Sequence, residues 1–101
     1  MYKGNIFKIK KGKLAQWKRW CNLLATKYKK EAIETLKEEN VTHEIFLIFS
    51  INKQYYTVGM TKGEAKPANM ERKLNQKHKI MKKECLKRIN SIEIGYEIYN
   101  K

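Results

Sequence analysis

Hydrophobic and polar residues alternate in two distinct periods along the chain, and these periods predict its strands and helices. Residues 2–10 alternate with period two, which is typical of a β-strand with one face in a core. From Lys13 the apolar positions recur every three or four residues, which predicts an amphipathic helix. Residues 29–30 are both lysine and interrupt this spacing, so the helical region is expected to bend or divide there. The spacing then resumes to about Glu39, and Asn40 suits the end of the helix.

Residues 41–51 form the strongest predicted strand, because their centre is apolar without a break. Such runs are typical of strands that are buried on both faces. The dipeptide Asn52-Lys53 fits a two-residue hairpin turn, after which residues 54–61 return as the next strand. The sequence leaves open which face of this hairpin meets the helices. The predicted register pairs Phe49 with Tyr56, Leu47 with Val58 and Ile45 with Met60, and it puts Glu44, Phe46 and Ile48 on the opposite face.

The last third of the chain predicts a second helix and a final strand. Pro67 suits the opening of a helix, and apolar positions then step by four and three as far as Ile89. The helix is expected to end at residues 90–91. Residues 92–98 alternate isoleucine or tyrosine with smaller or charged residues, which is typical of a strand. The apolar stripe of this helix consists of Met70, Leu74, His78, Met81, Cys85 and Ile89.

The order strand, helix, strand, strand, helix, strand predicts an α+β fold of the ferredoxin-like βαββαβ type. Right-handed crossovers place two helices on one face of a four-stranded antiparallel sheet. At 101 residues the chain is expected to form a single domain, residues 1–101. Two helices cover only one face, yet the hairpin is apolar on both. We therefore expect a homodimer in which two sheets pack face to face.

The formal net charge of +13 is the strongest signal in the composition. Lysine and arginine neutralise phosphates, so a nucleic-acid partner is one interpretation. Arginine occurs only as Arg19, Arg72 and Arg88, however, and specific base and phosphate readers favour arginine. The lysines are also scattered over every predicted element. These two observations favour a solvated, lysine-rich surface over a dedicated nucleic-acid site.

Several classes of protein do not fit the sequence. No apolar run approaches the ~20 residues that span a bilayer, and the N-terminus lacks an export signal, so a cytoplasmic protein without membrane contact is expected. Cys21 and Cys85 fall on predicted core stripes and are expected to stay reduced. No spacing typical of a metal site, a phosphate-binding loop or a nucleophile elbow occurs, so neither a metal nor a cofactor is expected. Haem is a weaker alternative, since one histidine suffices as its axial ligand.

His78 and Glu44 are the candidate catalytic residues. His78 lies on the apolar stripe of its helix, where a partly buried imidazole could act as general acid or base near pH 7. The alternative is a core histidine with one hydrogen bond. Glu44 precedes five apolar residues, and burial there would tune its carboxyl for proton transfer. The alternative is a charge that protects a strand edge from aggregation. Trp17, Trp20 and Tyr56 are candidate walls of the pocket.

Five short stretches of the chain resemble a known family. They are Lys10-Lys11-Gly12-Lys13, Trp20, Glu44-Ile45-Phe46, and Lys77-His78 with Glu84-Cys85. Across residues 6–86 the chain resembles a bacterial domain family of unknown function in the dimeric α/β-barrel superfamily. That superfamily includes cofactor-free antibiotic-biosynthesis monooxygenases, chlorite dismutase-like proteins and rhamnose mutarotases. The resemblance implies a dimer and adds Lys77 to the candidate pocket, but it implies no particular reaction.

Two functions from different classes remain. The first is a cofactor-free enzyme or small-ligand binder whose pocket lies between helices and sheet and takes a polar, carbonyl or sugar-like compound. The alternative is a non-catalytic basic dimeric module that binds nucleic acid or protein through its lysine surface. A small dimer with a purely structural histidine is a third possibility.

Overall fold

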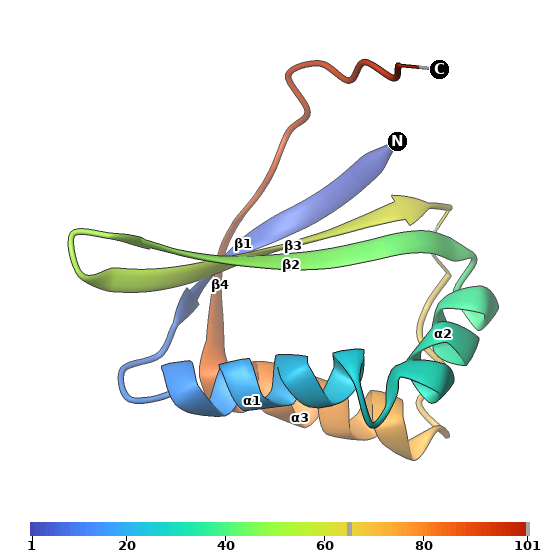
Figure 1. Ribbon diagram of the computed structural model, residues 1–101, viewed down its shortest axis with the longest axis horizontal. Helices are drawn as coiled ribbons and strands as arrows, with labels where there is room; N and C mark the ends of the chain where they lie inside the picture. The colour runs from blue at the N-terminus through green and yellow to red at the C-terminus, as the bar shows by residue number, and fades with distance from the viewer. Residues whose placement is uncertain (65, 101) are drawn as a thin grey trace.

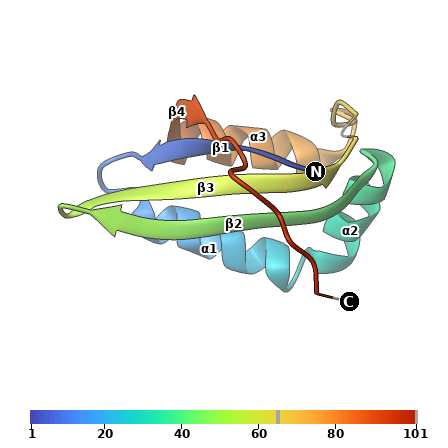
Figure 2. The same ribbon diagram turned by 90° about the horizontal axis from the view of Figure 1, so that it is seen from above.

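Four strands and three helices occur along the chain in the computed structural model, which describes residues 1–64 and 66–100 (Figure 1). The strands form one antiparallel sheet in the order β2-β3-β1-β4. All three helices lie on one face of this sheet (Figures 1 and 2). The arrangement confirms the predicted ferredoxin-like α+β fold. The elements are β1 (Tyr2–Ile9), α1 (Leu14–Ala25), α2 (Lys29–Glu38), β2 (Val41–Ile51), β3 (Gln54–Gly63), α3 (Lys73–Cys85) and β4 (Leu86–Ser91).

The first helical region divides into α1 and α2, at the place where the lysine pair interrupts the apolar spacing. Helix α1 ends at Ala25 and α2 begins at Lys29. The intervening turn is closed by a hydrogen bond from the Tyr28 backbone N–H to the Leu23 carbonyl oxygen, at 2.9 Å. Because of this break, α2 departs from the direction of α1 and lies near the start of β2 (Figure 1). The sheet is therefore covered by three helices and not by the expected two.

The β2–β3 hairpin has the predicted register. Asn52 and Lys53 form its turn with φ angles of 50° and 66°, both in the left-handed region. Two consecutive residues with positive φ are typical of the tight turn whose twist matches that of the flanking strands. Leu47 lies opposite Val58, as the turn position predicted.

This register settles which hairpin face meets the helices. Phe46 and Ile48 pack against the hydrophobic core, so the face that also carries Glu44 points toward the helices. Trp17 and Trp20 of α1 are fully buried in that core. Large aromatic side chains contribute most to the burial of apolar surface, so these two residues hold α1 against the sheet. The core consists of Phe7, Ile9, Trp17, Trp20, Leu74, Cys85 and Leu86.

The prediction of a last strand over residues 92–98 is wrong, and β4 lies earlier in the chain. Helix α3 ends at Cys85 and begins only at Lys73, so it is shorter at both ends than the apolar stripe indicated. Leu86 is buried and pairs with Ile9, which starts the strand directly after the helix. Strand β4 thereby uses most of the free edge of β1, and only residues 2–4 of β1 remain for the chain beyond. After one hydrogen bond from the Ile92 N–H to the Gly4 carbonyl oxygen, at 3.0 Å, the chain leaves the sheet (Figure 1).

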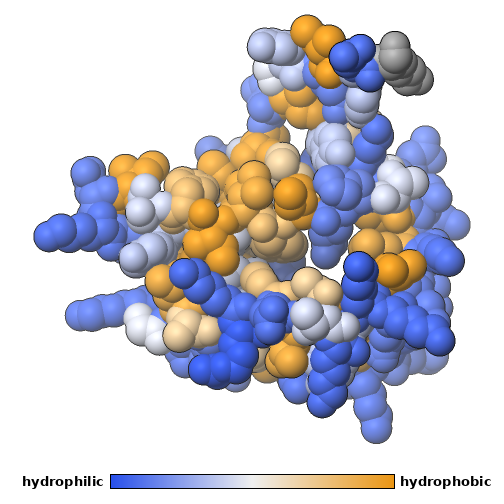
Figure 3. Space-filling view, viewed as in Figure 1, coloured by the Kyte–Doolittle hydropathy of each residue, from blue (hydrophilic) through white to orange (hydrophobic). Residues whose placement is uncertain are grey.

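The second face of the sheet carries a continuous set of apolar side chains that no helix covers. Leu47 is 46% exposed and Ile51 is 56% exposed. Figure 3 shows hydrophobic residues gathered at the level of the sheet, whereas the outer side of the helices is mostly hydrophilic. We call this surface the open face; the register assigns to it Ile6, Ile45, Leu47, Phe49, Ile51, Tyr56, Val58 and Met60.

Within the described residues, none of the helices has both the length and the apolar character that crossing a lipid bilayer requires.

Candidate functional site

A cavity of about 760 Å³ lies between the helices and the sheet. The end of α1, the length of α2, the first half of β2 and helix α3 all contribute to its walls. This volume is in the range of pockets that bind small molecules. Most of the wall is apolar and includes Leu24, Leu36, Phe46, Met70 and Leu74. The polar side chains of the wall include Thr35, Glu39, Glu44, Asn75, His78 and Lys82.

His78 is held in place by a hydrogen bond from Trp20. The indole Nε1–H donates to His78 Nδ1 at 2.8 Å. Because an indole nitrogen can only donate, Nδ1 must accept, and the proton of the neutral imidazole is therefore assigned to Nε2. The rings of Trp17 and Trp20 also stack on the imidazole, with centroid distances of 6.4 and 6.0 Å. Phe46 meets its edge at 6.3 Å. The hydrogen bond from Trp20 thus assigns the tautomer of His78, and the three ring contacts hold the imidazole in position.

The Nε2–H of His78 is accessible from the cavity. Among residues 1–64 and 66–100, Trp17 Nε1 is the one buried side-chain N or O atom without a hydrogen-bond partner. Within the same residues, His78 Nε2 has no hydrogen-bond partner either, and it is not fully buried. Since His78 lines the cavity, Nε2 is a free hydrogen-bond donor to whatever occupies that space.

Burial, together with the positive charge of Lys82, lowers the pKa of His78 from its usual 6.5 to about 4. The imidazole is therefore neutral at pH 7. A neutral ring whose Nδ1 is already occupied by Trp20 does not serve as a strong base. Its chemistry is that of a hydrogen-bond donor through Nε2.

Glu44 lines the same cavity as His78. Phe46, whose ring contacts His78, follows two positions later on the same face of β2, so Glu44 is about 6.5 Å further along the strand. The Glu44 side chain still reaches solvent at the cavity mouth. Burial against the cavity walls raises the pKa of its carboxyl, and Lys82 opposes that effect by lowering it. The structure thus places both candidate catalytic residues in the wall of one cavity, although they come from different elements.

Four charged residues of the cavity wall were not among the predicted site residues: Lys29, Glu39, Lys79 and Lys82. Lys82 lies one helical turn after His78 and influences the pKa of both His78 and Glu44. That i, i+4 spacing was a readable signal, because such positions share one face of a helix. Glu39 lies between α2 and β2, and burial first, then the charges of Glu44 and Glu38, raises its pKa. It carries no signal in the sequence, because it looks like one more glutamate of an exposed helix end.

The remaining predicted pocket residues lie elsewhere. Trp17 and Trp20 are fully buried behind His78, so they support the imidazole and do not form the cavity surface. Tyr56 lies on the open face, where it stacks on Phe49 at 5.5 Å; its prediction as a pocket wall is wrong because the hairpin turns that side away from the helices. The Nζ of Lys77 lies 5.7 Å from the centre of the Trp20 ring, on the outer side of the helices.

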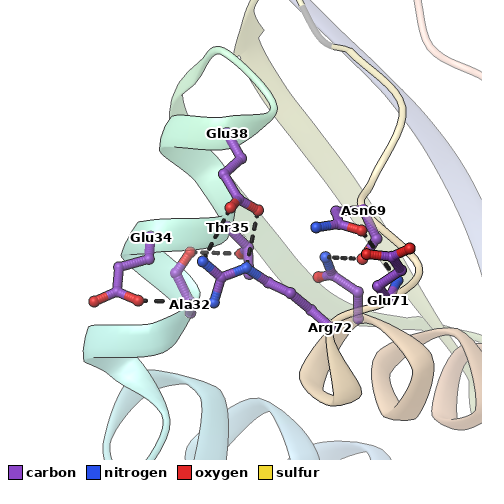
Figure 4. Close-up of polar contacts among 8 residues, drawn as sticks. Ala32, Glu34, Thr35, Glu38, Asn69, Glu71 and Arg72 are labelled. Atoms are coloured by element: carbon purple, nitrogen blue, oxygen red, sulfur yellow. Dashed lines mark hydrogen bonds and ion pairs between the residues drawn. The ribbon is translucent and has the colours of Figure 1, made fainter.

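An ion pair joins the two helices that flank the cavity. Arg72, which precedes the first turn of α3, donates two hydrogen bonds to the Glu38 carboxylate of α2, at 2.9 and 3.0 Å (Figure 4). Glu34 lies 3.7 Å from the same guanidinium. The guanidinium lowers the pKa of Glu38, chiefly through these hydrogen bonds. The pair therefore ties α2 to the start of α3, and so helps to fix the shape of the cavity.

Over residues 1–64 and 66–100, no group of three or more histidine, cysteine, aspartate or glutamate side chains could hold a metal ion. Cys21 and Cys85 are both free thiols. Burial raises the pKa of Cys21 to about 11, so it is not a thiolate nucleophile at pH 7.

Fold and site together define a small ferredoxin-like α+β protein with a cavity between its helices and its sheet. Residues 5–99 match the family of unknown function DUF6176, and the chain belongs to that family. Comparisons with curated proteins and with solved structures found no match for this chain.

Proposed function

We propose that this protein is a cofactor-free enzyme that binds a small carbonyl compound in the cavity and moves a proton at the carbon next to the carbonyl group. The observation that carries the proposal is the hydrogen bond from Trp20 to His78 Nδ1. That bond leaves the Nε2–H as a donor toward a cavity that also contains the Glu44 carboxyl. We place the reaction in the cytoplasm, as the sequence predicts.

The proposed proton transfer uses only side chains of this protein. The Glu44 carboxylate accepts the proton from the carbon, and the electron pair of the broken C–H bond moves toward the carbonyl oxygen. His78 Nε2–H donates a hydrogen bond to that oxygen as it becomes an enolate, and Lys82 adds a positive charge nearby. Glu44 then returns the proton to the enolate. Return to the original carbon restores the substrate, whereas return to another carbon or to an oxygen of the enolate gives an isomer. A carboxylate base paired with a neutral imidazole donor is an established solution for this chemistry.

The electrostatics of the site support these roles. A carboxyl whose pKa is raised by burial is a stronger base than one in water. A histidine with a lowered pKa stays neutral, so it can donate a hydrogen bond without carrying a charge that would pair with Glu44. A positioned general base contributes about 10²–10⁴ in rate. A single donor to a developing oxyanion contributes about 10²–10³.

Exchange of carbon-bound hydrogen in heavy water tests the proposal. The protein is incubated with 2-oxo acids, small ketones and reducing sugars, and proton NMR follows the loss of the signal next to the carbonyl group. We expect exchange of at least one of these compounds to depend on the protein. Glu44→Gln should abolish the exchange because the amide cannot accept the proton. His78→Asn should reduce it about 10²-fold, since Asn keeps an acceptor for Trp20 but lacks a donor at the Nε2 position.

Glu71→Gln is the matched control, because Glu71 is an exposed carboxylate between β3 and α3 that does not line the cavity. Its exchange rate should equal that of the wild type. Exchange that persists in Glu44→Gln would overturn the proposed base. A compound that stabilises the protein against heat but exchanges no hydrogen would instead identify a small-ligand binder without this reaction.

We also propose that two copies of the chain pair through the open face. The support is the set of exposed apolar side chains on that face, together with the resemblance to the dimeric α/β-barrel superfamily noted above. Isolated sheets with one such face are commonly covered by a second sheet. Analytical ultracentrifugation should then give twice the chain mass of 12.1 kDa.

Leu47→Glu should shift the protein to the monomer, because it places a charge in the centre of the open face. Ile80→Glu is the control: Ile80 is 56% exposed, comparable to Leu47, but lies on α3. A wild-type protein that sediments at the mass of one chain at all concentrations would overturn the dimer.

A further inference from the structure

Residues 92–100 form an extended segment, here called the C-terminal arm, that lies on the same side of the sheet as the open face. The arm begins at Ile92, whose N–H donates to the Gly4 carbonyl oxygen at 3.0 Å. Near its end, Lys62 of β3 donates a hydrogen bond to the Tyr99 hydroxyl, and the Lys62 Nζ lies 4.5 Å from the centre of the Tyr99 ring. The two views agree that the arm crosses above one end of the sheet and leaves the hairpin end uncovered (Figures 1 and 2).

The arm exposes large apolar side chains between these two contacts. Tyr96 is 83% exposed and Ile98 is 81% exposed, whereas Ile92 is half-buried against the sheet. The arm and the open face therefore present apolar side chains on the same side of the molecule (Figure 3). Exposed apolar surface of this extent is typical of a site that contacts another protein.

The charges of the arm differ from those of the rest of the chain. The net charge of the whole chain is +13, yet the two charged residues among positions 89–100 are Glu93 and Glu97. The hairpin end of the open face has the opposite character. Lys8 lies opposite Tyr56 on that face, Lys53 lies in the hairpin turn, and Ile51 beside them is 56% exposed. The arm thus has an apolar and acidic surface, and the hairpin end has an apolar and basic one.

We propose that the C-terminal arm of each copy packs on the hairpin end of the open face of a second copy. This inference rests on the proposed dimer and specifies its geometry. In one possible dimer, the two-fold axis lies in the plane between the sheets and runs across the strands. The arm end of one sheet then lies over the hairpin end of the other, and the glutamates of the arm meet the lysines of the hairpin end. An axis along the strands would instead place the two arms together, where their glutamates repel. The occupant of this surface is therefore a second copy of the same chain.

A double-mutant cycle on the dimer dissociation constant tests this geometry. The arm variant carries Tyr96→Ser and Ile98→Ser, the hairpin variant carries Ile51→Ser, and a third protein carries all three substitutions. All three side chains are exposed in the single chain, so the fold is retained and circular dichroism checks it. Each variant should raise the dimer Kd about tenfold or more, because each removes apolar contact area from the interface. The combined variant should raise Kd by much less than the product of the two, since the substituted groups contact each other.

Ile80→Ser serves as the control, because it removes an equally exposed isoleucine from α3, far from the sheet's open face, and should leave Kd unchanged. If the wild type dimerises and Leu47→Glu disrupts the dimer, but the arm variant has the wild-type Kd, the arm proposal is overturned while the dimer stands. Strictly multiplicative effects of arm and hairpin variants would overturn the pairing of these two regions. A monomeric wild type would overturn both the arm proposal and the dimer.

Discussion

Protonation of His78 should destabilise the folded protein as the pH falls. Burial lowers the pKa of this imidazole from 6.5 to about 4 in the folded state. Above pH 6.5 the ring is neutral in both the folded and the unfolded chain, so it has no effect on stability. Below pH 6.5 the unfolded chain binds a proton that the folded chain does not, and the free energy of unfolding decreases until about pH 4. The pKa difference corresponds to a loss of about 3 kcal/mol.

Other groups titrate in the same range, so the effect must be measured as a difference. Glu44 acts in the opposite direction, because its folded-state pKa is raised above 4.5. The stability that its protonated form contributes is fully present below pH 4.5 and is lost as the pH rises through the folded-state pKa. The matched variant is His78→Asn, which retains an acceptor for the Trp20 N–H and cannot titrate.

Urea unfolding of the wild type and of His78→Asn, between about pH 7 and about pH 4, gives the required comparison. The free energy of unfolding of the wild type should fall by about 3 kcal/mol more than that of the variant across this range. If the two proteins show parallel pH profiles, His78 is not buried as a neutral group, and the proposed donor role loses its basis.

Three further substitutions and one control substitution test the surroundings of the site. Trp20→Phe removes the donor to the imidazole and should cost at least about 1 kcal/mol in urea unfolding, since it leaves a buried acceptor without its partner. Gly59→Ala would put a methyl group 2.5 Å from the Phe46 ring and should cost about 1–3 kcal/mol, whereas Gly95→Ala, with nothing within 4 Å, should be neutral. Arg72→Gln should lower the melting temperature slightly and increase amide exchange in α2, and added salt should reduce the difference from the wild type.

The hairpin could be predicted in detail because its signals are local. The turn residues Asn52 and Lys53 fix the register, and the register then decides which side chains share a face. The last strand could not be predicted in the same way. Residues 92–98 have a strand-like alternation, but a strand also needs a partner edge, and Leu86 starts the pairing with β1 earlier. The amino-acid pattern shows the alternation, but it does not show how much of the β1 edge remains unpaired after β4.

In the candidate site, too, the features set by local sequence could be predicted, and those set by tertiary contacts could not. Helical spacing was enough to predict that His78 is buried and that it faces the sheet. The tautomer of His78 could not be predicted, since it depends on a tertiary contact with Trp20, 58 positions away. The meeting of His78 with Glu44 likewise depends on which hairpin face turns toward the helices. That choice is made by the packing of Phe46 against the aromatic core.

The tautomer of His78 at neutral pH determines whether the imidazole can donate a hydrogen bond into the cavity. Long-range proton–nitrogen NMR correlations of the imidazole distinguish a ring protonated on Nε2 from one protonated on Nδ1 and from an imidazolium. The structure predicts a neutral ring with its proton on Nε2 and an unprotonated Nδ1 that accepts from the Trp20 indole. A proton on Nδ1, or a doubly protonated ring at pH 7, would contradict the account.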